Sequence, residues 1–138
     1  MKAITFKLGT EDFSIDISYL KEIKPFKELK NTYVPNSPAM LKGLVNLRGS
    51  LVPVLDLGVI FNIKNKETYV IILSLKNRII GIFADSIGRI VEIKDNELEK
   101  VPSTISKEEA KYISGVKRHK DKLLIHIKPE SLLKIKEE

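Results

Sequence analysis

The chain has 138 residues, the usual size of one domain, and a chain of this length buries roughly two thirds of the surface it exposes when unfolded. It contains no cysteine, so disulfides and thiolate metal sites are excluded, and its apolar runs are far shorter than the ~18 residues that cross a bilayer as a helix. No apolar segment leads the chain, so we expect a soluble, cytoplasmic protein with no direct membrane insertion.

The charge balance is basic, with 24 Lys and Arg against 18 Asp and Glu and a formal net charge of +6. Such a charge raises the question of binding to nucleic acid or to an acidic membrane surface. Here the lysines are spread along the chain and alternate with acids, whereas nucleic-acid-binding surfaces cluster their cations and add exposed aromatic rings. We expect a solvated, lysine-rich surface, and a basic β-barrel that binds nucleic acid is the alternative function.

The first third of the chain begins with β-structure. Residues 3–8 alternate apolar and polar side chains, and residues 13–17 repeat the pattern, which predicts a β-hairpin with one wet face. Residues 18–23 space their apolar side chains by three, which predicts a single helical turn ended by Pro25. Residues 26–42 carry only weak signals: a short strand at Tyr33 and Val34, a rigid loop, and one helical turn after Pro38.

Residues 43–57 hold two apolar runs separated by one charged side chain, Arg48. Glycines at 43 and 49 permit backbone angles that other residues avoid, so a tight turn is predicted at Arg48 between two buried strands. The continuous run 51–55 predicts a strand covered on both faces, and Pro53 marks an edge or a bulge in it.

The rest of the chain adds two more hairpins. Residues 56–61 predict a short helix capped by Asp56, and residues 62–67 form a polar connector. The remaining predicted elements are a hairpin over 68–85, an irregular stretch over 86–102 with one strand near 89–93, a helical turn after Ser106, a hairpin over 112–127, and a helix opened by Pro129. Short strands with few helices predict an all-β sandwich or barrel fold, and the polar connector favours two small barrels.

Motifs for catalysis or metal binding are absent from the sequence. It contains no glycine-rich phosphate loop, no His-Glu-x-x-His and no nucleophile elbow. His119 lies among cations, and His126 alternates within an apolar strand, so neither is expected to bind a metal. The aspartates that could form a catalytic pair all lie at strand ends or turns, where capping suffices: Asp12, Asp16, Asp56 and Asp85. We therefore expect no enzyme activity and no cofactor.

Two charged residues stand out as candidates for a binding surface. Arg48 offers a rigid fork of donors suited to a carboxylate or to backbone carbonyls, and Glu22 lies beside Leu20 and Ile23. Each is equally well explained as an exposed turn residue paired with an opposite charge. Residue chemistry alone leaves both readings open.

The motif at 43–57, GLVNLRGSLVPVLDL, closely resembles the signature of the CheW family of bacterial chemotaxis adaptors. The resemblance extends over essentially the whole chain. Its other landmarks, in order, are Phe6-Lys7-Leu8-Gly9, Phe13-Ser14-Ile15-Asp16-Ile17, Glu22-Ile23, the glycine-containing run 78–85, Tyr112-Ile113-Ser114-Gly115 and Leu123-Leu124-Ile125.

The resemblance implies one CheW-like domain over residues 1–138. Its fold would be two five-stranded SH3-like β-barrels around a common core with a short C-terminal helix, barrel one being 14–63 and barrel two 1–13 with 64–138. Its function would be that of a non-catalytic adaptor, monomeric when free, between the cytoplasmic tip of methyl-accepting chemoreceptors and the regulatory domain of the histidine kinase CheA. It would be cytoplasmic and recruited to membrane-associated receptor arrays.

The resemblance also implies two sets of contact residues. Receptor binding would use a groove between the barrels formed by Leu20, Glu22, Gly43 and Arg48, in a helix-in-groove mode where apolar residues supply area and charges fix orientation. Kinase binding would use loop and barrel residues in the regions of Val34, Pro35 and Leu41. The connector at 62–67 is shorter than is usual in the family, and the net charge is positive where many members are acidic, which bears on the choice of partner. A CheW-like adaptor of a kinase pathway other than motility is a further alternative.

Overall fold

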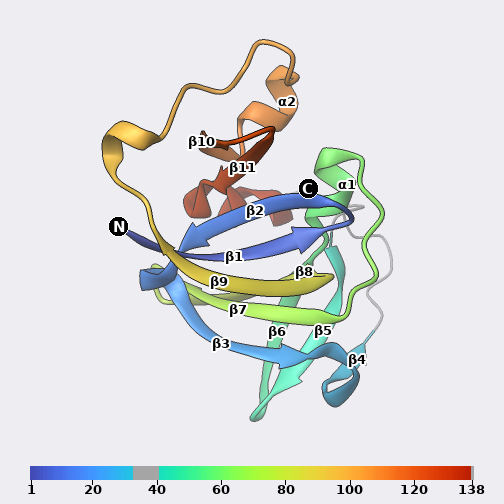
Figure 1. Ribbon diagram of the computed structural model, residues 1–138. Coiled ribbons are helices and arrows are strands. Elements are labelled where there is room, and N and C mark those ends of the chain that lie inside the picture. Colours follow the sequence, from blue (N-terminus) through green and yellow to red (C-terminus); the bar gives the residue numbers. More distant parts are fainter. Residues whose placement is uncertain (33–40, 138) are drawn as a thin grey trace.

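The protein is a mostly β molecule built from two curled sheets, seen in a computed structural model that describes residues 1–32 and 41–137, the last three for their backbone only. The first sheet has the order β10-β11-β2-β1-β9 and the second the order β3-β7-β8-β6-β5-β4. In Figure 1, β10, β11 and α2 lie at the top, β1, β2 and β9 in the middle, and the second sheet below them.

The five-stranded sheet consists of β1 (Lys2–Leu8), β2 (Glu11–Asp16), β9 (Ser86–Glu92), β10 (Ile113–His119) and β11 (Lys122–Ile127). The six-stranded sheet consists of β3 (Leu20–Pro25), β4 (Lys30–Thr32), β5 (Leu41–Leu47), β6 (Ser50–Leu55), β7 (Tyr69–Leu75) and β8 (Arg78–Ala84). The α-helices are α1 (Leu57–Phe61) and α2 (Lys107–Ala110), and the 3-10 helices are η1 (Ile17–Tyr19), η2 (Phe26–Glu28), η3 (Asp95–Glu97) and η4 (Pro129–Glu137).

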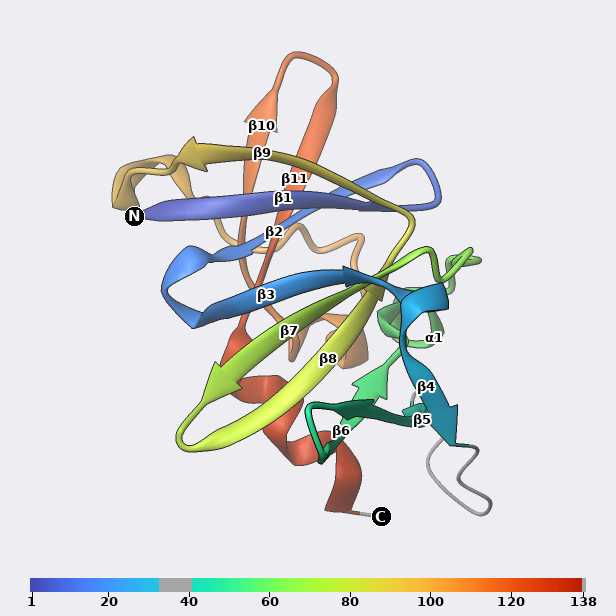
Figure 2. The same cartoon turned by 90° about the horizontal axis from the view of Figure 1, so that it is seen from below.

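Most neighbouring strands are antiparallel, and each sheet contains one parallel pair. Strand β11 runs parallel to β2, and β6 runs parallel to β8, so hairpins distant in sequence are joined within each sheet. Figure 2 shows the β7–β8 hairpin lying between β3 and the β5–β6 hairpin, as the strand order requires.

The alternation of apolar residues explains how the two sheets share a core. In β1, Ile4, Phe6 and Leu8 are buried and pack against Ile71 and Leu73 of β7 in one common cluster. The other face of β7 enters a second cluster inside the six-stranded sheet. Because both faces of β7 are covered, its sequence is a nearly continuous apolar run.

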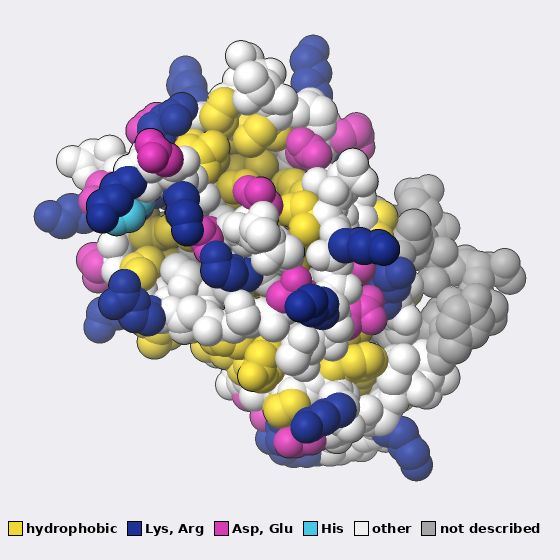
Figure 3. Space-filling view, turned by 45° about the vertical axis from the view of Figure 1, so that its right-hand side comes forward, with side chains coloured by type: hydrophobic (Ala, Val, Ile, Leu, Met, Phe, Trp, Pro, Cys, Tyr) yellow, Lys and Arg dark blue, Asp and Glu magenta, His cyan; other side chains and the backbone are white. Residues whose placement is uncertain are grey.

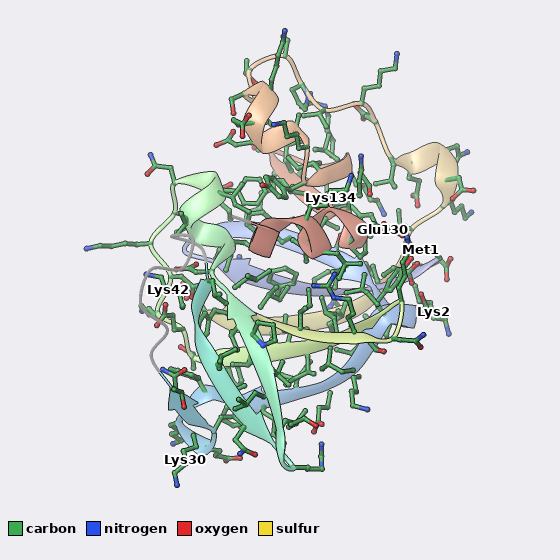
Figure 4. The ribbon with its side chains drawn as sticks, turned by 180° about the vertical axis from the view of Figure 1, so that it is seen from behind. Met1, Lys2, Lys30, Lys42, Glu130 and Lys134 are labelled. Carbon is green, nitrogen blue, oxygen red and sulfur yellow. The ribbon has the colours of Figure 1, made fainter. Side chains whose placement is uncertain are left out.

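The C-terminal helix η4 closes the back of the molecule. Figure 4 shows it lying across the rear of the sheets, with Glu130 at the end nearer Met1. Leu132 is 2% exposed and belongs to the common core, and the hydroxyl of Tyr19 donates to Glu130 Oε2 at 2.9 Å. The predicted short helix after Pro129 is confirmed, and its apolar residue at 132 is what anchors it.

The predicted all-β class is confirmed, as are the three predicted hairpins, while three elements differ from expectation. The helical turn predicted over 18–23 is limited to η1, and residues 20–25 form strand β3. Strand β4, at the edge of the six-stranded sheet, was not predicted because its three residues are all exposed and carry no apolar pattern. Leu41 and Lys42 belong to strand β5 and not to a helical turn, while Tyr33, Val34 and Pro38 lie outside the described residues.

The barrel boundaries 14–63 and 1–13 with 64–138 stay a prediction, and sheet pairing connects strands across them. Strands β7 and β8 fall within the expected second barrel, but β7 pairs with β3 and β8 with β6 in the six-stranded sheet. All of β2 belongs to the five-stranded sheet. In this position both faces of the β7–β8 hairpin are buried, one in each core cluster.

Candidate functional site

The site is centred on the turn between β5 and β6. Arg48 and Gly49 both have positive φ, 51° and 90°, and connect the register pair Leu47 and Ser50. A two-residue turn with two positive φ angles is the type I′ hairpin turn, whose twist matches that of the flanking strands. The side chain of Asn46 stabilises it by accepting the Gly49 N–H at 2.9 Å. The tight turn predicted at Arg48 is therefore present.

Arg48 reaches from this turn to Glu22 on β3. Its Nη1 donates to Glu22 Oε2 at 2.5 Å and its Nη2 to Glu22 Oε1 at 2.9 Å, a two-pronged contact between a planar fork and a carboxylate. Strand β3 is the first and β5 the fifth in the order of the sheet, so the contact exists only because the sheet curls. The pair ties the tip of one hairpin to the opposite edge of the same sheet.

The pair leaves Arg48 largely open to a partner. The Arg48 side chain is 64% exposed, whereas that of Glu22 is 21% exposed. Hydrogen bonds from Arg48 hold the pKa of the Glu22 carboxyl below its ordinary value, with Lys24 and Lys21 adding smaller attractions against partial burial. Glu22 is thus an anion at neutral pH, and Arg48 has donors beyond the two it gives to Glu22.

The other two expected receptor-binding residues take no part in this ion pair. Leu20 is on β3, one bulge before Glu22, and packs half-buried against the common core. Gly43 is five positions before Arg48 on β5, about 16 Å along the strand. A side chain at 43 would collide with Asn31 and come within 3.1 Å of the Thr32 carbonyl oxygen. The local role of Gly43 is to let β4 lie against β5.

The expected kinase-binding residues are only partly covered by the structure. Val34 and Pro35 lie outside the described residues. Leu41 begins β5, pairs with Leu55 of β6 and packs half-buried against the common core. Part of its side chain therefore contacts the core and only the remainder could contact a partner.

Some exposed apolar residues were not predicted, and one of them directly follows the Arg48 turn. Leu51 follows the β5–β6 turn and is 60% exposed, although the run 51–55 indicated a strand covered on both faces. Ile90 on β9 is 54% exposed. In a continuous apolar run the sequence does not indicate which residue faces water. The structure shows that Leu51 does.

The titratable residues weighed for chemistry have structural partners. His126 is buried and its Nδ1 shares a hydrogen bond of 2.8 Å with Ser14 Oγ. Each aspartate accepts a hydrogen bond: Asp12 from Lys7, Asp16 from Ser18, Asp56 from Gly58 and Asn65, and Asp85 from Gly9 and Lys66. Within the described ranges no group of three or more His, Asp or Glu could hold a metal ion, and no helix is long and apolar enough to cross a membrane.

Comparison with known proteins agrees with this architecture. Residues 2–137 match the CheW-like domain family, and the chain belongs to that family. It is 30% identical over 138 residues to the chemotaxis protein CheW of Klebsiella aerogenes and also to that of Helicobacter pylori, in each case covering 97% of this chain and 82% of the relative. The crystal structure of the scaffolding protein TtCheW from Thermoanaerobacter tengcongensis superposes with a TM-score of 0.80 at 27% identity, covering 92% of this chain and 83% of that one.

Proposed function

We propose that this protein is a non-catalytic adaptor that couples methyl-accepting chemoreceptors to the histidine kinase CheA. Membership in the CheW-like family and similarity to the scaffolding protein TtCheW support a coupling role. The protein would act in the cytoplasm, recruited to receptor arrays by its two partners.

The observation that carries the receptor part of the proposal is the contact between Arg48 and Glu22. The contact holds a mostly exposed cation at a rigid turn, with the exposed apolar side chain of Leu51 three residues further on. An amphipathic receptor helix needs this combination of apolar area and fixed charge. Leu20 and Gly43 contribute by placing β3 and β5, and Leu41 with the region of Val34 and Pro35 is proposed for the kinase.

The test is a titration of the purified chain with a receptor-tip fragment and, separately, with the regulatory domain of CheA. We expect both fragments to bind and Arg48→Ala to weaken receptor affinity by about 30-fold while leaving kinase affinity within a factor of two. Because the Arg48–Glu22 pair is exposed to solvent, the melting temperature should change by no more than about 2 °C.

A matched control is available on the other sheet. Arg118 is 60% exposed and pairs with Glu99 at 3.3 Å, so Arg118→Ala removes a comparable surface cation and ion pair. This variant should bind the receptor fragment like the parent protein. Tight, salt-sensitive binding to DNA or RNA with no binding to either fragment would refute the adaptor function in favour of nucleic-acid binding.

A further inference from the structure

A basic hollow of about 360 Å³ lies on the five-stranded sheet, away from the Arg48 turn. Strands β9 and β10 are the two edges of that sheet, and the hollow is lined from both, by Arg89 and Val91 on one side and Lys117 on the other. Its floor follows the strand register, in which Lys117 is opposite Leu124 and Leu124 is opposite Asp12. The hollow is thus formed by the concave face of the curled sheet.

The hollow carries uncompensated positive charge. Asp12, its one acidic lining residue, is already paired with Lys7 at 2.7 Å, and Lys117 is paired with Glu97 at 3.4 Å. The other two cations of the lining have no carboxylate within 4.0 Å among the side chains that the structure describes: Arg89 and Lys122. Figure 3 shows lysine and arginine side chains, with acidic side chains among them, around an exposed histidine at the left of the view.

The backbone that carries one of these cations is fixed by a hydrogen bond. Thr5 Oγ1 donates to the Arg89 carbonyl oxygen at 2.9 Å, at the bulge where the register of β1 and β9 shifts. The hydrogen bond fixes the backbone of β9 at Arg89. A cation on a fixed backbone loses less freedom when it binds an anion than one on a mobile loop does.

The rest of the lining is partly apolar and contains no Phe, Tyr or Trp, its one ring being the imidazole of His119. Val91, Leu123 and Leu124 line the hollow and are each half-buried. A lining with one imidazole and no Phe, Tyr or Trp disfavours stacking of successive nucleic-acid bases, and the volume lies at the small end of ligand pockets. We propose that this hollow binds a small amphiphilic anion, with a phosphate or carboxylate between Arg89 and Lys122 and a short apolar body against Val91 and Leu124.

Three probes separate the charge from the apolar body: hexyl phosphate, inorganic phosphate and hexanol. Each is titrated at neutral pH into the isotope-labelled protein and followed by the amide resonances of all residues. We expect hexyl phosphate to shift amides of the hollow and to bind at least about fivefold more tightly than inorganic phosphate, because burying even two methylenes provides such a factor. Hexanol should bind more weakly than hexyl phosphate.

The charge requirement is tested with a double variant, Arg89→Gln with Lys122→Gln. It should weaken hexyl phosphate binding at least about fivefold and melt like the parent protein, since both side chains are exposed. The charge-matched control is Lys27→Gln with Lys30→Gln, two exposed lysines of the other sheet region, which should bind like the parent. Equal weakening in both double variants, shifts spread over all lysine-rich surfaces, or hexanol binding as well as hexyl phosphate would overturn the proposal.

Discussion

The buried pair Ser14 and His126 allows a sharp test of how the C-terminal hairpin is attached. Ser14 on β2 is 0% exposed and His126 on β11 is 3% exposed, and these residues are opposite each other in a parallel ladder of only three residue pairs. Ser14→Ala would leave His126 Nδ1 buried without its partner, which costs about 1–3 kcal/mol. In a domain of this size each kcal/mol lowers the melting temperature by about 4 °C, so a fall of about 4–12 °C is expected.

Thermal unfolding followed by circular dichroism measures this change. The control is Ser74→Ala, an exposed serine on β7, which should melt within about 2 °C of the parent protein. If Ser14→Ala melts within about 1 °C of the parent, the hydrogen bond does not hold β11 against β2 and the reasoning fails.

The same pair predicts a pH dependence. Burial lowers the pKa of His126 below its ordinary value of 6.5, so the folded protein holds the neutral ring while the unfolded chain takes up a proton more readily. Stability from this group is therefore complete above about pH 6.5 and declines as the pH falls toward about 5.5. In His126→Gln, which cannot ionise, the fall in melting temperature over that interval should be smaller. An unchanged pH dependence would contradict the assignment.

Two further substitutions test the sheet junctions. In Gly81→Ala, the new Cβ would lie 2.7 Å from Val70 Cγ1, so overpacking should cost about 1–3 kcal/mol; a urea midpoint equal to that of the parent would show that β8 can shift. In Asp85→Asn, the carboxylate that accepts the N–H groups of Gly9 at 2.7 Å and Lys66 at 2.5 Å loses its charge and one acceptor, so the protein should melt about 4–12 °C lower; no change would mean that water replaces these bonds.

The sequence was most informative where an apolar period is regular. Residues 3–8 alternate strictly and form β1 as predicted, with Ile4, Phe6 and Leu8 buried. Strand β3 was missed because a bulge between Leu20 and Glu22 interrupts the two-residue period. An irregular ladder therefore hides a strand from pattern analysis even when its pairing with β7 is complete on either side.

Long-range partners could not be read from the sequence at all. Arg48 and Glu22 are 26 positions apart, and each was a separate candidate with an unassigned opposite charge. Only the curl of the six-stranded sheet, in which β3 and β5 are not neighbours, brings them into contact. The sequence likewise predicted the hairpin of β7 and β8 without indicating which sheet it would join.

The central claim is that Arg48 contacts the receptor and does not merely fix the turn. The most direct measurement is the affinity of the charge-swapped protein, Glu22→Arg with Arg48→Glu, for the receptor-tip fragment. The swap can re-form the ion pair, so melting should stay within about 2 °C of the parent. We predict that receptor affinity remains about 30-fold weakened because the exposed charge is reversed. Recovery of parental affinity in the swapped protein would contradict the claim and make the pair a purely structural tie.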